Sequence, residues 1–100
     1  GHWPERMNKM KIQQMSNGKG GTVKNQFIIF SPEATYFQSY QTIIVKTDFD
    51  ENGKRRVTLD EKAWDYSKTT GKYRNLFLGE SKKETERKIK NGEYILVDLN

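Results

Sequence analysis

The residues of this sequence that could best do chemistry are cations and aromatic rings, and they are concentrated after Asp60. The segment WDYSKTTGKYRN, which starts at Trp64, interleaves rings, cations and hydroxyl groups. Phosphate contacts use cations and hydroxyl groups, and base stacking uses rings. A second run of cations, KKETERKIK, starts at Lys82. If the cations of these two segments share one face of the protein, they form a surface that can bind a polyanion. The alternative is that they belong to an ordinary solvated surface.

The candidate nucleic-acid-binding residues are the cations that could contact phosphates and two rings that could stack on bases. They are Lys19, Lys24, Lys68, Lys72, Arg74, Lys82, Lys83, Arg87, Lys88, Lys90, Tyr66 and Tyr73. Lys19 lies in the loop GKGGT, and Lys24 follows it. The phosphate loop of nucleotide hydrolases has Ser or Thr directly after its lysine, whereas Gly20 follows Lys19 here. The rings have an alternative role in the core, because the chain is poor in aliphatic residues.

Other kinds of chemistry have little support in this sequence. There is no cysteine, and the single histidine is His2, so a nucleophilic triad cannot be built. The run DFDENG from Asp48 matches only the first half of a calcium loop, because Leu59 occupies the position of the bidentate glutamate. We therefore expect no enzyme activity, no metal and no cofactor. A metal nuclease built from Asp48, Asp60, Glu61 and Lys62 stays an alternative, because its metal ligands would converge only in space.

Composition supports one small basic domain. The 100 residues include 18 basic and 13 acidic side chains, a net charge of +5. The charge is uneven, since residues 61–90 hold nine cations against five acids and residues 91–100 hold two acids alone. Because only 33% of the residues are hydrophobic but 12% are aromatic, we expect a core rich in rings.

The two ends of the sequence and its hydropathy set the expected organisation. Residues 1–6, GHWPER, fit no periodic pattern and are expected to be an expression remnant or a disordered arm, with a single domain over 7–100. No apolar run approaches the roughly 18 residues of a membrane helix, and the amino terminus lacks the apolar stretch of a secretory signal. We expect a soluble cytoplasmic protein with no membrane partner.

Strands are predicted where β-branched and aromatic residues cluster between turn residues. The predicted strands cover Met10–Met15, Gln26–Phe30, Thr35–Tyr40, Thr42–Thr47 and Arg55–Leu59. Asn52-Gly53 between the last two favours a tight hairpin. The inner face of this hairpin is predicted to hold Ile43, Val45, Val57 and Leu59.

The β pattern stops after Asp60, and helices are predicted from there. The spacing of Trp64, Tyr66, Tyr73, Phe77 and Leu78 favours short helices over Glu61–Tyr66 and Thr70–Leu78. Ser81 and Glu84 form a capping box for a helix of about nine residues that Asn91-Gly92 would end. Glu84 to Lys88 and Glu86 to Lys90 are predicted ion pairs on this helix.

The run EYILVDL from Glu93 predicts a closing strand, which its branched residues place at the centre of the sheet. The predicted fold class is therefore α+β. It consists of a small antiparallel sheet of about five to six strands, a meander of hairpins, followed by two or three short helices and the closing C-terminal strand.

Three stretches, SNGKGGTVKNQFII from Ser16, TYFQSYQTII from Thr35 and WDYSKTTGKYRNLFLGE from Trp64, resemble a family of small uncharacterised proteins encoded by tailed bacteriophages, phages of gut bacteria among them. The resemblance covers nearly everything from Met10 to Leu99. It implies an accessory role, either on phage nucleic acid or on a host factor, in the cytoplasm of the host cell. The family has no assigned activity, cofactor or catalytic residue.

Two hypotheses about partners follow. The first is a non-enzymatic protein that binds DNA or RNA through a Lys/Arg-rich helical face. The alternative is a protein-interaction module, such as an inhibitor of a host factor or defence system or a small homo-oligomer. It would use an exposed sheet edge or the face of Tyr36, Gln38 and Tyr40.

Overall fold

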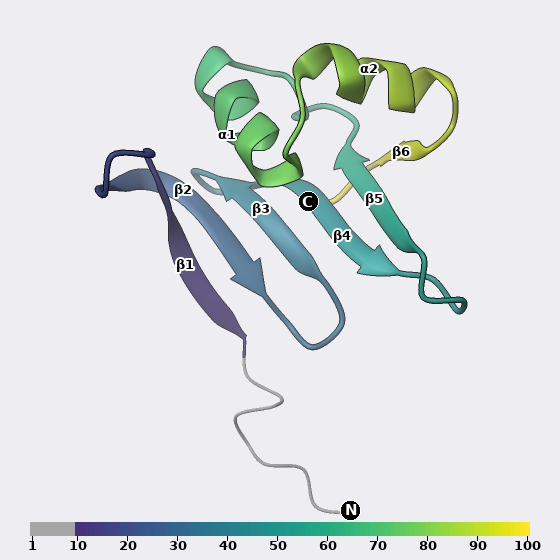
Figure 1. The fold of residues 1–100 in the computed structure, drawn as a ribbon, viewed down its shortest axis with the longest axis horizontal. Coiled ribbons are helices and arrows are strands. Elements are labelled where there is room, and N and C mark those ends of the chain that lie inside the picture. The colour runs from purple at the N-terminus through teal and green to yellow at the C-terminus, as the bar shows by residue number, and fades with distance from the viewer. Residues whose placement is uncertain (1–9) are drawn as a thin grey trace, which may run out of the picture.

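The computed structural model describes residues 10–100, which form a mixed β-sheet and two helices (Figure 1). In chain order the elements are β1 Lys11–Ser16, β2 Thr22–Phe30, β3 Thr35–Ser39, β4 Thr42–Phe49, β5 Arg55–Asp60, α1 Lys68–Leu78, α2 Lys82–Lys90 and β6 Tyr94–Val97. The strand order in this six-stranded sheet is β1-β2-β3-β4-β5-β6. The predicted α+β class is confirmed, and the prediction for residues 1–6 lies outside the described residues.

The first five strands form antiparallel hairpins, as predicted. In the β4–β5 turn, the carboxylate of Asp50 accepts hydrogen bonds from the backbone N–H groups of Asn52, at 2.8 Å, and Lys54, at 2.9 Å. Gly53 adopts a φ of +81°, which glycine tolerates best. The run that resembles half of a calcium loop is therefore a hairpin turn.

The last strand differs from its prediction. β6 pairs parallel with β5 and lies at the edge of the sheet, so the predicted central position is wrong. A parallel neighbour needs a long crossover, which residues 61–93 supply. Since β4 already occupies one side of β5, the closing strand can add only to the other side. Branched residues therefore indicated a strand correctly but not its place in the sheet.

The core lies between the sheet and the two helices. Phe37, Val45 and Leu59 are fully buried and lie side by side on neighbouring strands. The ring of Phe37 stacks on Phe77 of α1 with 5.9 Å between centroids. Tyr94 lies on the same side and contributes to the same cluster. Both helices therefore cover one face, near one end of the strands (Figure 1), and the predicted contribution of rings to the core is confirmed.

A β-bulge changes the inner face of β4. Phe37 pairs with Val45 but Gln38 pairs with Ile43, so Ile44 is an extra residue in the ladder. Ile44 is fully buried, whereas Ile43 is only half-buried, and the prediction that Ile43 faces the core is wrong. The other predicted members of this face are buried: Val45, Val57 and Leu59.

The segment before α1 is not the predicted helix. Residues 61–66 form turns, in which the N–H of Trp64 donates to the carbonyl of Asp60 at 3.1 Å. Ser67 is extended, with a φ of −152°, and its hydroxyl accepts a hydrogen bond from the N–H of Thr70. An extended N-cap cannot continue a helix, so the helix starts at Lys68.

The boundaries of α2 are confirmed. The hydroxyl of Ser81 accepts the N–H of Glu84 at 3.2 Å, which caps the helix start. Asn91 is the C-cap, and Gly92 follows with a φ of +86°. Neither helix in the described part of the chain has the length and hydrophobicity needed to cross a membrane.

The ion pairs predicted on α2 are replaced by others. Glu84 binds Arg87 at 3.0 Å, and Lys88 binds Glu80, which precedes the helix, at 2.8 Å. Lys88 prefers Glu80 because that carboxylate is held against β6 on the inner side of the helix. The ion pairs among residues 10–100 do not include the predicted pair Glu86 to Lys90.

Candidate nucleic-acid interface

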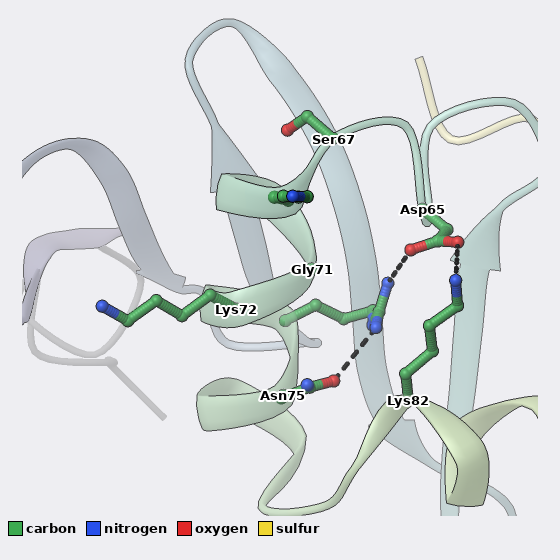
Figure 2. A pocket seen from close by; sticks show the side chains of 8 residues that line it. Asp65, Ser67, Gly71, Lys72, Asn75 and Lys82 are labelled. Atoms are coloured by element: carbon green, nitrogen blue, oxygen red, sulfur yellow. Dashed lines mark hydrogen bonds and ion pairs between the residues drawn. The ribbon is translucent and has the colours of Figure 1, made fainter.

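An open pocket of about 480 Å³ lies between α1 and the start of α2 (Figure 2). Four cations and one carboxylate are among its lining residues, which gives the lining a net charge of +3. We call it the α1–α2 pocket, and its lining residues are Asp65, Ser67, Lys68, Gly71, Lys72, Arg74, Asn75 and Lys82.

Arg74 is the buried anchor of this pocket. Its Nη1 donates to the carbonyl of Trp64 at 2.6 Å and to the carboxylate of Asp65 at 3.1 Å, and its Nη2 donates to Asn75 at 3.0 Å. The guanidinium also lies 5.2 Å from the centre of the Trp64 ring, a cation–π distance. Because Arg74 is fully buried, it joins α1 to the preceding segment and has no surface to offer a ligand.

Asp65 is shared by two cations. One oxygen binds Arg74 and the other binds the Nζ of Lys82 at 2.7 Å, as the dashed lines in Figure 2 show. Burial raises the pKa of Asp65, but hydrogen bonds from Lys82 and Arg74 outweigh it and hold the pKa below its ordinary value of 3.8. One ionised carboxylate against two cations leaves this part of the pocket positive.

Lys68 and Lys72 are exposed and one helical turn apart on α1. Neither forms an ion pair with an acid in residues 10–100. The Nζ of Lys72 lies 5.4 Å from the centre of the Tyr73 ring, and its side chain extends away from Asp65 (Figure 2). These two ammonium groups are therefore available to an anion from solution.

The two candidate stacking rings are placed differently. Tyr73 is 6% exposed and belongs to the core, so a base cannot reach its face. Tyr66 is 50% exposed and lines a second open pocket of about 480 Å³. The remaining lining residues of this pocket are Gln41, Thr42, Asp60, Lys62, Ala63, Asp98 and Asn100.

Apart from Lys82, the cations of α2 do not join those of α1 in the lining of this pocket. Arg87 is paired with Glu84, and Lys88 is half-buried with its Nζ 2.8 Å from Glu80. Lys83 and Lys90 are exposed, but their part of the surface also contains acidic side chains. The concentration of positive charge is therefore in the α1–α2 pocket.

Lys19 and Lys24 are exposed on the β1–β2 hairpin. Its loop is ordered by Asn17, whose side-chain oxygen accepts the N–H groups of Lys19, at 2.8 Å, and Gly21, at 3.3 Å. The loop lies at the end of the sheet where α1 lies (Figure 1). These two lysines are not part of the pocket lining.

A buried polar contact that the sequence did not predict sets α1 onto the sheet. The hydroxyl groups of Ser39 and Thr70 lie 3.0 Å apart, and Ser67 donates to Thr70 at 3.1 Å. Gln26, opposite Ser39 on β2, is fully buried, and its side-chain amide has no hydrogen-bond partner in the described structure. Ser67 is of a residue type common at helix N-caps, but Ser39 lies 31 residues before Thr70, and no local pattern predicts their contact.

Glu80 connects α2 to β6. Its carboxylate accepts hydrogen bonds from Thr85 at 2.6 Å, Lys88 at 2.8 Å and the hydroxyl of Tyr94 at 2.8 Å. Burial raises the pKa of Glu80, but these hydrogen bonds outweigh burial and hold it below the ordinary 4.5. The charged form therefore stabilises the packing of α2 on β6.

The lowered pKa of Glu80 predicts a loss of stability in acid. A carboxyl group with a depressed folded-state pKa stabilises fully above its unfolded-state pKa, and this contribution is lost as the pH falls through the folded-state value. We expect Glu80→Gln to lower the free energy of unfolding at neutral pH and to reduce its fall below about pH 4.5. Urea unfolding over a pH series measures both effects.

Glu51→Gln is the matched control, because Glu51 is exposed and pairs with no cation among residues 10–100. It should leave the acid dependence unchanged. Identical pH dependence in wild type and Glu80→Gln would mean that the carboxylate adds nothing to the fold. A residual acid dependence is expected in Glu80→Gln, because the pKa values of Asp60 and Asp65 are also lowered.

Among the described residues, no group of three or more His, Cys, Asp or Glu side chains is arranged to hold a metal ion. Comparison of the chain with curated proteins and with solved structures finds no match. The model of a family of unknown function, DUF8033, matches residues 10–93, which is more than half of the chain. The chain therefore belongs to the DUF8033 family of unknown function.

Proposed function

We propose that this protein binds single-stranded nucleic acid, with phosphates in the α1–α2 pocket, and that it has no enzymatic activity. The observation that supports this most is the pocket itself, whose lining contains four cations and a single carboxylate. Phosphate contacts supply most of the affinity in sequence-independent binding of nucleic acids. A net charge of +5 would also attract a polyanion from a distance.

The cations of the pocket have distinct roles in this proposal. Lys68 and Lys72 are unpaired with acids within residues 10–100 and contact phosphates directly. Lys82 is 52% exposed, and exposed ion pairs are weak, so it can leave Asp65 for a phosphate. Arg74 keeps Asp65 in place when this happens, because their contact is independent of Lys82.

Tyr66 supports a single strand over a duplex. Asp65 and Ser67 line the α1–α2 pocket, whereas Tyr66 between them lines the neighbouring pocket. Since consecutive Cα atoms are about 3.8 Å apart, a phosphate site and an exposed ring lie next to each other. An unpaired base can stack on a ring in this position, and bases inside a duplex cannot.

The biological setting is part of the same proposal. The resemblance of three stretches to small phage-encoded proteins supports an accessory protein that acts on phage nucleic acid in the cytoplasm of a host cell. DNA and RNA are both accommodated, because the pocket and the ring recognise features common to both.

The proposal predicts salt-sensitive binding that depends on two lysines. We expect Lys68→Gln with Lys72→Gln to weaken binding of a fluorescent oligothymidine about tenfold and to lower the slope of log affinity against log salt by about 1.4, or 0.7 per phosphate contact. Fluorescence polarisation at several salt concentrations measures both quantities. Tyr66→Ala should cost about 1 to 3 kcal/mol of binding free energy with little change in the salt slope.

A double variant with the same net charge is the control. Lys11→Gln with Lys54→Gln removes two exposed lysines from β1 and the β4–β5 turn, outside the lining of the pocket. Equal weakening by the two double variants would show that the pocket has no special role. The absence of binding to single-stranded DNA and RNA at low salt would remove the proposal altogether.

A further inference from the structure

We propose that the outer edge of β6 binds an extended segment of a partner protein as an added strand, and that this segment is apolar in the middle and basic at its ends. β6 is the last strand of the sheet, and its sequence YILV contains no charge and no proline. Proteins usually protect such edges with charges, prolines or bulges, because an edge strand recruits other strands. No residue of β6 lines the α1–α2 pocket, so this inference does not depend on the proposed phosphate contacts.

The side chains of β6 are unusually exposed for an apolar strand. Ile95 is 57% exposed, Leu96 36% and Val97 37%. The opposite edge of the sheet differs, since β1 begins with Lys11 and its ladder with β2 is interrupted by a bulge. The two edges are therefore not equivalent, and β6, although short, contains no charged side chain, proline or bulge.

The backbone of β6 has groups that face outward. The carbonyl of Val97 accepts the N–H of Glu61 at 2.8 Å, so Val97 turns its backbone groups towards β5. Backbone groups of successive residues in a strand point alternately to its two sides, so Ile95 also faces β5. The N–H and C=O groups of Tyr94 and Leu96 then point to the open side, where no strand of residues 10–100 lies.

Both ends of this strand are fixed. The hydroxyl of Tyr94 donates to Glu80 at 2.8 Å on one side. Beyond β6, the side-chain amide of Asn100 donates to the carbonyl of Ile43 at 3.0 Å and accepts its N–H at 2.7 Å, as a strand neighbour would. A preformed edge loses little conformational entropy when a partner strand binds, which favours association.

Charge determines which partner fits. Glu93 and Asp98 flank β6, and residues 91–100 contain no Lys or Arg although the chain as a whole is basic. A second copy that pairs antiparallel about Leu96, whose backbone groups face the open side, would bring two Glu93 and two Asp98 to one short ladder to which residues 91–100 add no cation, and these like charges repel. Glu93 already lies 4.0 Å from Arg87, but both side chains are more than half exposed and such a pair is weak, so a partner strand with Lys or Arg at its ends still gains attraction at both positions.

The test is a selection from a display library of random peptides of about ten residues, the upper length of an ordinary strand. Wild type and Leu96→Pro serve as targets, since proline removes an outward N–H without taking a hydrogen bond from β5. We expect wild type to enrich alternating apolar peptides with basic ends. A synthetic form of the most enriched peptide should bind Leu96→Pro about tenfold or more weakly, because main-chain hydrogen bonds are lost.

Two further measurements do not use Leu96→Pro, so they remain valid even if the proline destabilises the fold. In the free wild-type protein, the amides of Tyr94 and Leu96 should exchange rapidly, and binding of the selected peptide should slow them. The amide of Ile95 should be protected both in the free protein and in the complex. Selection on Glu93→Lys should lose the basic preference at the peptide end that faces residue 93.

Three results would overturn the proposal. The first is no enrichment on wild type over Leu96→Pro, and the second is a selected peptide that protects other strands and leaves Leu96 unchanged. The third is light scattering that shows a wild-type dimer and a Leu96→Pro monomer, because a second copy of the chain would then occupy this edge.

Discussion

Arg74→Met is expected to lower the free energy of unfolding by about 3 kcal/mol, the lower end of the range for breaking a buried ion pair. Methionine keeps most of the volume but cannot donate the hydrogen bonds that Arg74 gives to Trp64, Asp65 and Asn75. The carbonyl of Trp64 is then left without this donor. The loss stays near the lower end because Asp65 is partly exposed and keeps Lys82. Urea unfolding measures the difference.

Arg56→Met is the control for this experiment. Arg56 also forms a two-pronged contact with an aspartate, donating to both oxygens of Asp48 at 3.1 and 2.8 Å. Its side chain is more than half exposed, so water replaces the lost partner and the effect should be much smaller. If Arg74→Met and Arg56→Met are destabilised equally, burial does not make the contacts of Arg74 more stabilising than those of the exposed Arg56. An unchanged stability of Arg74→Met would show that α1 is held by other contacts.

Asp60→Ala is expected to cost at least about 3 kcal/mol, because hydrogen bonds to a charged acceptor contribute about 1.5 to 3 kcal/mol each and four are lost together. The buried carboxylate of Asp60 accepts the backbone N–H groups of Lys62, at 3.2 Å, Ala63, at 2.9 Å, and Leu99, at 2.9 Å. It also accepts a hydrogen bond from the side chain of Asn100 at 3.1 Å. Urea unfolding measures the total loss.

The damage from Asp60→Ala should be greatest at the end of β6. Amide exchange of Leu99 and Val97 should accelerate more than that of β3, because Asp60 joins the segment after β6 to the end of β5. Asp98→Ala is the comparison, since the exposed Asp98 accepts only the N–H of Asn100 among the hydrogen bonds of residues 10–100. A uniform acceleration across the whole sheet in Asp60→Ala would contradict this local role.

Features that depend on nearby residues were predictable from the sequence. Asn52-Gly53 predicted the β4–β5 turn, because the left-handed conformation at Gly53 depends on that residue alone. Ser81 and Asn91-Gly92 predicted both ends of α2 for the same reason, since caps form within a few residues. The α+β class followed from the order of these local patterns.

Features that depend on distant residues were not predictable in the same way. The bulge at Ile44 depends on how β4 pairs with β3, and the consecutive apolar run Ile43-Ile44-Val45 does not by itself say which of these residues faces the core. The edge position of β6 depends on β4 already occupying the other side of β5. Both errors concern which neighbour a residue meets and leave its secondary structure correctly predicted.

The candidate site was predicted in part for the same reason. From the sequence, Lys68, Lys72 and Arg74 are all candidate phosphate-binding cations. In the structure the two lysines are exposed and the arginine is buried. The orientation of α1 decides this, and Ser39, distant in sequence, contacts α1 through Thr70. The lining of the α1–α2 pocket therefore contains only some of the candidate cations that were predicted from the sequence.

Chemical-shift mapping with oligothymidine at low salt tests the central claim most directly. If the α1–α2 pocket binds phosphates and Tyr66 stacks on a base, the largest shifts in a proton–nitrogen spectrum should fall on the amides of residues 65–72 and Lys82. The amides of β1 and of the β4–β5 turn should stay in place. Shifts spread evenly over all exposed lysines, or confined to the sheet, would contradict the account.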